Sequence, residues 1–217
     1  MDWHTWHEHY AEPGSDLSQR LAAVQEHLRT AVDACPPGPI RLISMCAGDG
    51  RDVIGVLARH PRRDDVTARL VELDRRNTAV AEAAIEAAGL PGVQIVTGDA
   101  ALTDSYDGMV PADVVLMCGV FGNITDADIE RTVDHAAQFC ATGGTVIWTR
   151  GRTPPDLLPQ ICDWFEARGF DRVWVSSPDV GYGVGVHRLA AASQPLASGE
   201  SMFAFVGYDV LSAKTTS

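Results

Sequence analysis

The stretch that most constrains the fold of this chain is residues 40–52, with the sequence IRLISMCAGDGRD. It begins as an apolar, β-branched run and passes through Ala47-Gly48-Asp49-Gly50 into a segment with helical character. A strand that enters a helix through glycines leaves bare backbone N–H groups at the helix N-terminus. Such a turn is either a pocket for a nucleotide or another polar ligand, or a plain strand–helix connection.

Helical and strand patterns alternate on both sides of this turn. Apolar residues recur at steps of three and four between residues 15 and 33, which predicts an amphipathic helix that a proline pair ends. From residue 40 onwards the patterns predict, in order, strand 40–46, helix 50–60, strand 66–72, helix 75–88, strand 93–97, strand 112–118, a helix capped at Thr125, strand 144–149 and helix 155–168. Near-continuous apolar strands between helices predict a parallel sheet with both faces covered.

The pattern changes after residue 169. Strands are predicted at 170–176 and 202–206, and only a Gly/Ser/Ala-rich connection over 177–200 joins them. Two strands without a crossover helix between them can pair in antiparallel fashion. We therefore predict one α/β domain with a Rossmann-like, doubly wound sheet of seven mostly parallel strands, one antiparallel strand near the C-terminus and helices on both faces. Residues 1–39 form an N-terminal arm and helix, 40–210 the domain and 211–217 a frayed tail.

Charge and composition exclude several classes of function. The formal net charge of −12 repels a phosphate backbone, so nucleic acid is not an expected partner. No apolar run approaches the roughly 20 residues that span a bilayer, so no membrane partner is expected, and the N-terminus lacks the layout of a signal peptide. The five cysteines are never spaced C-x-x-C, which favours reduced thiols and a cytoplasmic location. The only lysine is Lys214, which rules out a P-loop and Schiff-base chemistry.

Residues suited to binding a nucleoside follow the predicted strands. Glu72 stands at the tip of an apolar strand about 20 residues after the glycines, where a carboxylate accepts both hydroxyls of a ribose. Asp99 follows the next strand, where it can accept from an exocyclic amine such as that of adenine, or lie in a solvated turn. Cys118-Gly119-Val120 ends the fourth strand with small residues, whereas Asp74 is expected to cap a helix. Because the carboxyl ends of parallel strands share one edge, these residues are predicted to meet there.

With these motifs in this order, residues 40–150 resemble the class I S-adenosylmethionine-dependent methyltransferases. The sequence SMCAGDG at 44–50 is similar to that family's acid-x-Gly-x-Gly-x-Gly turn, with Ser44 in place of the acid and Cys46 in place of the first glycine. VELD at 71–74 looks like the second motif, TGDA at 97–100 like the third, and ADVVLMCGVFGNI from residue 112 like the fourth. The trailing strand pair fits the family's antiparallel seventh strand.

The resemblance implies S-adenosyl-L-methionine as cofactor and assigns its contacts by motif. Glu72 then holds the ribose, Asp99 lies near adenine and the strand end at Cys118 faces the sulfonium. The full set of cofactor-binding residues implied is Cys46, Ala47, Gly48, Gly50, Glu72, Leu73, Asp99, Ala100, Cys118 and Gly119.

Two other functions remain open from the sequence. A nicotinamide-dependent oxidoreductase would share the sheet, but its G-x-G-x-x-G fingerprint fails because Val53 stands at the third glycine position. A catalytically silent protein that binds S-adenosylmethionine or S-adenosylhomocysteine would share the cofactor site, since methyl transfer can proceed through proximity and orientation alone.

The acceptor is expected to be a small molecule, with its identity and its methylated atom undetermined. The fourth strand lacks the Asp/Asn-Pro-Pro-Tyr/Phe turn of enzymes that methylate amino groups of nucleobases and glutamine. His187 and His7 are candidate general bases for a hydroxyl acceptor, with a surface histidine as the alternative for each. Candidate residues of the acceptor pocket are Trp3, Trp6, Tyr10, Trp148, Arg150 and Tyr182.

The first fourteen residues are too aromatic for a plain tail, and they read either as a lid over the active site or as an arm packed elsewhere. Their histidines match no familiar zinc spacing, so no metal is predicted. The oligomeric state is left open by the sequence.

Overall fold

The computed structural model describes residues 14–206. Its strands are β1 (Ile40–Met45), β2 (Val66–Glu72), β3 (Val93–Thr97), β4 (Ala112–Met117), β5 (Cys140–Gly151), β6 (Phe170–Val175) and β7 (Tyr182–Leu189). Its helices are α2 (Asp16–Ala34), α3 (Arg51–Leu57), α4 (Arg75–Ala88), α5 (Asp126–Phe139) and α6 (Leu158–Ala167), with short 3-10 turns η2 (Arg63–Asp65) and η3 (Thr103–Tyr106).

The strands form one seven-stranded sheet in the order β3-β2-β1-β4-β5-β7-β6. The pairs β1–β2, β1–β4, β2–β3 and β4–β5 are parallel, and β7 runs antiparallel to both β5 and β6. This confirms the predicted fold class. The strand order reverses between β1 and β4, so a crevice is expected beyond the carboxyl ends of these two strands.

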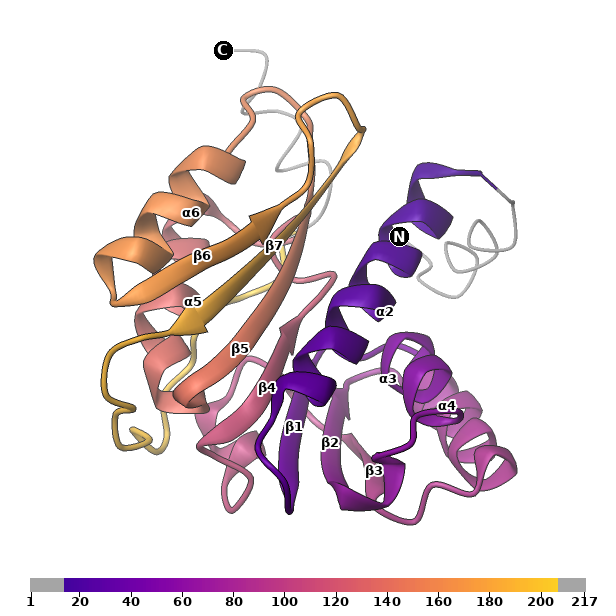
Figure 1. The fold of residues 1–217 in the computed structure, drawn as a ribbon. Helices are drawn as coiled ribbons and strands as arrows, with labels where there is room; N and C mark the ends of the chain where they lie inside the picture. Colours follow the sequence, from indigo (N-terminus) through magenta and orange to yellow (C-terminus); the bar gives the residue numbers. More distant parts are fainter. Residues whose placement is uncertain (1–13, 207–217) are drawn as a thin grey trace.

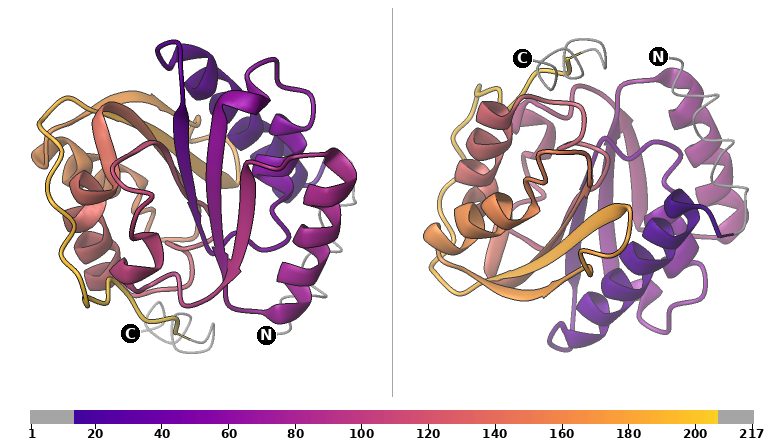
Figure 2. Two further views of the ribbon diagram at one scale, coloured as in Figure 1. Left: turned by 90° about the horizontal axis from the view of Figure 1, so that it is seen from below. Right: turned by 90° about the horizontal axis from the view of Figure 1, so that it is seen from above.

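Helices cover both faces of the sheet (Figures 1 and 2). One apolar cluster lies under α2, α3 and α4, where Leu28 and Leu57 pack against Leu42 with no exposed surface. The other lies under α5 and α6 and includes Phe139 and Trp148. None of the helices within residues 14–206 is long and apolar enough to span a bilayer.

Helices α4 and α5 begin at the capping residues that the sequence predicts, and α2 begins at a cap that it did not predict. The side chain of Ser15 caps α2, that of Asp74 caps α4 and that of Thr125 caps α5, each by accepting a backbone N–H in the first turn. Gly89 ends α4 in a left-handed conformation, with φ of 60°. The local sequence thus sets the limits of these helices.

The structure corrects the position of the antiparallel strand. The sequence predicts a strand at 202–206, whereas the antiparallel strand is β7, which lies within the segment predicted as a loop. The glycines of β7 are packing positions: a Cβ at Gly185 would lie 2.3 Å from the ring of Trp148, and one at Gly183 would lie 2.4 Å from the side chain of Leu158. A pattern of glycines that reads as a loop therefore forms a strand, because large side chains occupy the space above it.

The C-terminal segment 201–206 runs along the edge of the sheet instead of joining it. Ser201 makes a single antiparallel bridge with Leu102, and the backbone N–H of Met202 donates to the carbonyl of Ala101 at 2.9 Å. The N–H of Val206 donates to the carbonyl of Asn123, also at 2.9 Å. These bonds hold the segment beside the loops that follow β3 and β4.

The predicted division into 1–39, 40–210 and 211–217 stays a prediction. Within the described residues, α2 contributes Val24 and Leu28 to the same apolar cluster as β1.

Candidate active site

The glycine turn after β1 adopts left-handed backbone conformations at Cys46 (φ 51°), Gly48 (φ 58°) and Gly50 (φ 70°). Cys46 is the only non-glycine residue with positive φ among residues 14–206. A Cβ at Gly50 would lie 2.9 Å from the side chains of both Ile54 and Leu70, so glycine is needed there for the turn to lie on the sheet. The turn brings its backbone N–H groups to the N-terminal end of α3.

Glu72 ties the end of β2 to this turn. Its Oε2 accepts the backbone N–H of Gly48 at 2.8 Å, and its Oε1 accepts that of Asp74 at 2.9 Å. Each carboxylate oxygen keeps a further lone pair for a ligand. Asp74 instead accepts the N–H of Arg76 at 2.8 Å and ion-pairs with that guanidinium, as expected of a helix cap.

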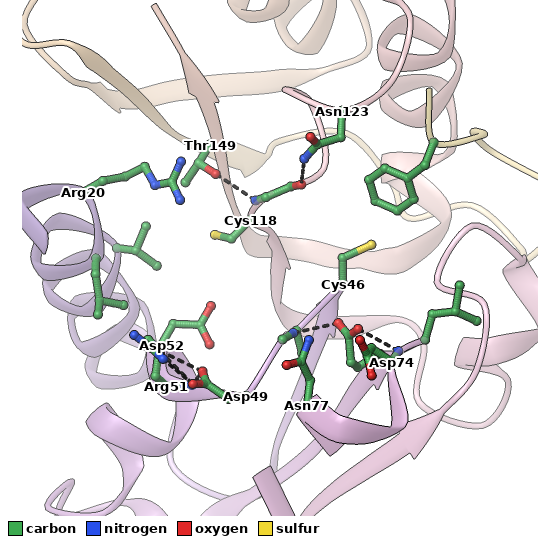
Figure 3. A pocket seen from close by; sticks show the side chains of 18 residues that line it. Arg20, Cys46, Asp49, Arg51, Asp52, Asp74, Asn77, Cys118, Asn123 and Thr149 are labelled. Atoms are coloured by element: carbon green, nitrogen blue, oxygen red, sulfur yellow. Dashed lines mark hydrogen bonds and ion pairs between the residues drawn. The ribbon is translucent and has the colours of Figure 1, made fainter. Parts of the chain in front are cut away.

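A cavity of about 440 Å³ lies over the turn and the carboxyl ends of β1, β2 and β4 (Figure 3). It is lined by Arg20, Leu21, Val24, Cys46, Ala47, Gly48, Asp49, Arg51, Asp52, Glu72, Leu73, Asp74, Asn77, Cys118, Gly119, Asn123, Thr149 and Phe205. We call it the main pocket. It includes seven of the residues expected to bind the cofactor: Cys46, Ala47, Gly48, Glu72, Leu73, Cys118 and Gly119.

Three expected cofactor residues do not line the main pocket. Gly50 is the last residue of the turn and packs against Ile54 and Leu70, and Ala100 is buried with 4% of its surface exposed. Asp99 is exposed, and its Oδ1 accepts the N–H of Ala101 at 2.9 Å. Asp99 and Glu72 are nonetheless near Cys46, because both carboxylates add to the effect of burial in raising the pKa of that thiol. Cys46 is therefore a neutral thiol at physiological pH and not a nucleophile.

Several lining residues could not be found from the sequence. Arg20, Leu21 and Val24 come from α2, whose amphipathic pattern shows that one face is buried but not that its flank borders a pocket. Phe205 comes from the segment that was predicted as a strand. The sequence does contain a signal that could have identified Asp52 as a lining residue, since this acid lies directly after the glycine turn, in the first turn of α3.

Asp52 is the buried acid of the main pocket, with 8% of its surface exposed. Burial raises the pKa of its carboxyl to about 6, against the opposing effect of the Val53 N–H that donates to it at 2.8 Å. Asp52 and Arg20 are both close enough to Cys118 to act on the pKa of its thiol, which burial raises above its usual range. In Figure 3, the guanidinium of Arg20 points toward Cys118 and Thr149. The end of the main pocket near Cys118 thus carries both a carboxyl group and a guanidinium.

A second, smaller pocket of about 170 Å³ adjoins this end. It shares Arg20, Gly119, Asn123 and Thr149 with the main pocket and is completed by Asp16, Leu17, Gly122, Arg150, Gly151, Gly181 and Tyr182. The Oγ1 of Thr149 accepts the N–H of Gly119 at 2.9 Å, which fixes the shared wall. Two of the residues expected at the acceptor, Arg150 and Tyr182, lie in this second pocket.

The assignments of His187 as base and Trp148 as acceptor contact are corrected by their positions. Both are fully buried and line neither pocket. The Nε1–H of Trp148 donates to His187 Nδ1 at 3.1 Å, and the His187 ring stacks on Phe165. Burial lowers the pKa of His187 to about 4, so the ring is neutral. His187 lies far from the pockets because β7 runs antiparallel to β5. Its partner there is Val146, so His187 lies away from the carboxyl ends of the parallel strands.

The remaining candidates, His7, Trp3, Trp6 and Tyr10, lie outside the described residues. Their roles, and the hypothesis of an N-terminal lid, stay predictions.

Comparison with known proteins gives a family match over most of this fold. Residues 15–161, from α2 into α6, match the family described as "Putative methyltransferase". No curated protein matches the sequence.

Solved structures share the fold at low sequence identity. An O-methyltransferase family protein from Burkholderia thailandensis is similar with a TM-score of 0.61 and 20% identity, over 84% of this chain and 57% of that one. The 1,6-didemethyltoxoflavin-N1-methyltransferase of the same organism, crystallised with its substrate and S-adenosylhomocysteine, gives 0.64 and 14%, over 87% and 84%. Magnesium protoporphyrin IX methyltransferase from Synechocystis PCC 6803, with bound S-adenosylmethionine, gives 0.64 and 12%, over 86% and 90%. The chain thus spans less than two thirds of the first of these proteins.

The family match covers the glycine turn, Glu72 and the ends of β4 and β5, which are the elements that build the main pocket. This chain belongs to that methyltransferase family and has the fold of the class I S-adenosylmethionine-dependent methyltransferases.

Proposed function

We propose that the main pocket binds S-adenosylmethionine and that its methyl group passes to a small molecule in the second pocket. The observation that carries this proposal is that the two pockets share one wall, formed by Gly119, Asn123 and Thr149 with Arg20. A cofactor that fills the main pocket would end against this wall, and an acceptor in the second pocket would approach it from the other side.

The lining of the main pocket suits the cofactor from end to end. Leu73, 68% exposed, offers an apolar surface to the adenine. Glu72, held in place by two backbone N–H groups, is oriented to accept the ribose hydroxyls. Asp52 and Arg20 are complementary to the ammonium and carboxylate of the methionine end. The sulfonium would then lie near Cys118 and Gly119, at the shared wall.

The chemistry requires orientation more than any invariant side chain. A lone pair of the acceptor atom forms a bond to the methyl carbon while the carbon–sulfur bond breaks, and its electron pair stays on sulfur to give S-adenosylhomocysteine. An oxygen or nitrogen acceptor releases its proton to water or to a base. Holding the two reactants in line across the shared wall can supply much of the rate enhancement. Neither described pocket lining contains a histidine, so His7 stays the proposed base for a hydroxyl acceptor.

The findings bear on the two alternative functions, an oxidoreductase and a silent binding protein, in different ways. The family match removes the nicotinamide-dependent oxidoreductase. A catalytically silent binding protein shares the main pocket and differs only in turnover. We also propose a cytoplasmic location, with which five free thiols agree.

Calorimetry tests the cofactor. We expect S-adenosylmethionine and S-adenosylhomocysteine to bind and NAD not to bind, and NAD binding without a response to S-adenosylhomocysteine would overturn the assignment. Turnover is tested by release of S-adenosylhomocysteine from S-adenosylmethionine in the presence of a cell extract divided at about 1 kDa. Release with the small-molecule fraction alone supports the proposed acceptor class. Release only with the macromolecular fraction contradicts it, and release with neither favours the silent binding protein.

A further inference from the structure

We propose that the acceptor is a small anion, a carboxylate on a scaffold about the size of one six-membered ring, and that Arg150 binds its charge in the second pocket. This inference rests on the proposed function and names the class of substrate for the same site.

Arg150 is a buried cation with incomplete compensation. Its side chain is 14% exposed, and its Nη1 donates to the carbonyl of Phe121 at 2.8 Å. The nearest carboxylate oxygen, on the mostly exposed Asp126, is 3.9 Å from Nη2, which is too long for a hydrogen bond. Nε is buried without a hydrogen-bond partner among the described residues. A buried guanidinium in this state is costly, and a bound anion would compensate it.

Arg150 is not a surface arginine, because only 14% of its side chain is exposed. Burial lowers the pKa of its guanidinium, and Asp126 and Asp156 oppose this effect only in part. The side chain still carries its charge, because an arginine is not deprotonated in proteins. By contrast, Arg152 nearby ion-pairs with Asp156 and donates to the carbonyls of Ser176 and Tyr182. The chain thus satisfies one arginine at this edge of the sheet and leaves its neighbour partly unsatisfied at the pocket.

The described lining of the second pocket holds more guanidiniums than carboxylates, in a protein whose formal net charge is −12. Arg20 and Arg150 contribute two guanidiniums to its described lining, against one carboxylate, Asp16. Asp16 lies in the first turn of α2 and packs over Gly181, where an added Cβ would come within 2.2 Å of its Oδ2. Arg150 is the cation assigned to the acceptor, since Arg20 also lines the main pocket.

The dimensions limit the acceptor. A cavity of about 150 Å³ accommodates benzene, so a pocket of about 170 Å³ accommodates one six-membered ring with a small substituent. Tyr182 contributes an aromatic side chain to the lining, and a Cβ at Gly122 or Gly151 would meet nothing within 4 Å, so these two glycines leave room for the ring. With a carboxylate at Arg150, the opposite side of the ring would face Gly119 and Thr149 at the shared wall, where the methyl group arrives.

The test compares benzoate with benzamide, which has nearly the same shape and no charge. Calorimetry with saturating S-adenosylhomocysteine would be run on the wild-type chain, on Arg150→Gln, on Arg150→Lys and on the control Arg29→Gln. Arg29 is half exposed on α2, pairs with Glu26 and lines neither pocket. Its replacement by Gln changes the net charge by the same amount as Arg150→Gln without altering a pocket. We expect benzoate to bind at least tenfold more tightly than benzamide to the wild-type chain. Arg150→Gln should lose at least tenfold of the benzoate affinity, Arg150→Lys should recover part of it and Arg29→Gln should change it less than twofold.

Either of two results overturns the proposal: benzamide binding as tightly as benzoate, or benzoate affinity unchanged in Arg150→Gln. Failure of benzoate to bind the wild-type chain also overturns it. The wild-type comparison of the two probes needs no variant, so it decides the matter even if Arg150→Gln does not fold. Binding of S-adenosylhomocysteine is read separately in each sample, so a failure of the cofactor assignment is distinguishable from a failure of the acceptor assignment.

Discussion

At the scale of single residues, Cys46 keeps a left-handed backbone at a position where the family's turn usually has glycine. The first glycine of that turn is replaced here, yet the residue keeps φ at 51°. A left-handed conformation costs a non-glycine residue roughly 1–2 kcal/mol. The chain tolerates this strain because the N–H of Ala47 is bonded to Val71 and that of Gly48 to Glu72, which fixes the turn on both sides.

The two acids at the end of β2 are expected to differ in function. Glu72→Gln should weaken S-adenosylhomocysteine binding by tenfold or more, because an amide cannot accept the Gly48 and Asp74 N–H groups and two ribose hydroxyls at once. Asp74→Asn keeps a capping oxygen and should change the affinity less than threefold. Calorimetry on both variants checks this, and the reverse order of losses would show that the ribose is held by the other acid.

The carboxylate of Asp52 is expected to lower the stability of the fold and to strengthen cofactor binding. Its folded-state pKa of about 6 lies above the usual value of 3.8, so the ionised carboxylate destabilises the fold above pH 6, by about 2–3 kcal/mol. Asp52→Asn should therefore raise the free energy of unfolding at pH 7.5, and this gain should fade as the pH falls from 6 to 4. The same variant should bind S-adenosylmethionine more weakly, because it lacks the charge for the methionine ammonium.

Denaturant unfolding at several pH values measures the stability effect of Asp52→Asn. The exposed Asp64→Asn serves as control and should show no such dependence on pH. A loss of stability at pH 7.5 in Asp52→Asn, or a gain that does not vary with pH, would contradict the assignment of a buried carboxylate with a raised pKa.

At the scale of elements, β7 depends on two glycines, Gly183 and Gly185, on the face that packs against Leu158 and Trp148. Gly185→Ala would place a Cβ 2.3 Å from the ring of Trp148, which is fully buried between the sheet and α6. We expect this variant to lose about 3 kcal/mol or more of unfolding free energy, as for an overpacked core. Gly151→Ala is a matched control in the neighbouring strand, since its Cβ would meet nothing within 4 Å. Equal midpoints of thermal unfolding for the two variants would mean that the ring can move aside.

At the scale of the whole molecule, α2 contributes to both pockets. Arg20 lines both, and Asp16 and Leu17, in the first turn, line the second. The first turn of α2 therefore borders the proposed acceptor pocket. Deletion of residues 2–12 is expected to reduce methyl transfer strongly while the melting temperature changes little. Full turnover by the truncated chain would show that this segment is not a lid.

The sequence by itself determined the order of the elements from α2 to β6, the caps of α4 and α5 and the class of fold. These features depend on local signals: the period of apolar residues, the side chains of Asp74 and Thr125 at helix starts, and glycines in the turn after β1. It also determined that Glu72 and the glycine turn share one edge of the sheet, because parallel strands end together.

Only the tertiary structure decided which residues reach the pockets and which strand is antiparallel. Gly183 and Gly185 read as loop residues until Leu158 and Trp148, distant in sequence, are seen above them. His187 reads as an exposed loop base until the antiparallel direction of β7 carries it into the core. Arg20 and Phe205 line the main pocket because α2 and the C-terminal segment pack beside it. Contacts between segments far apart in sequence depend on packing, and local sequence patterns do not predict them.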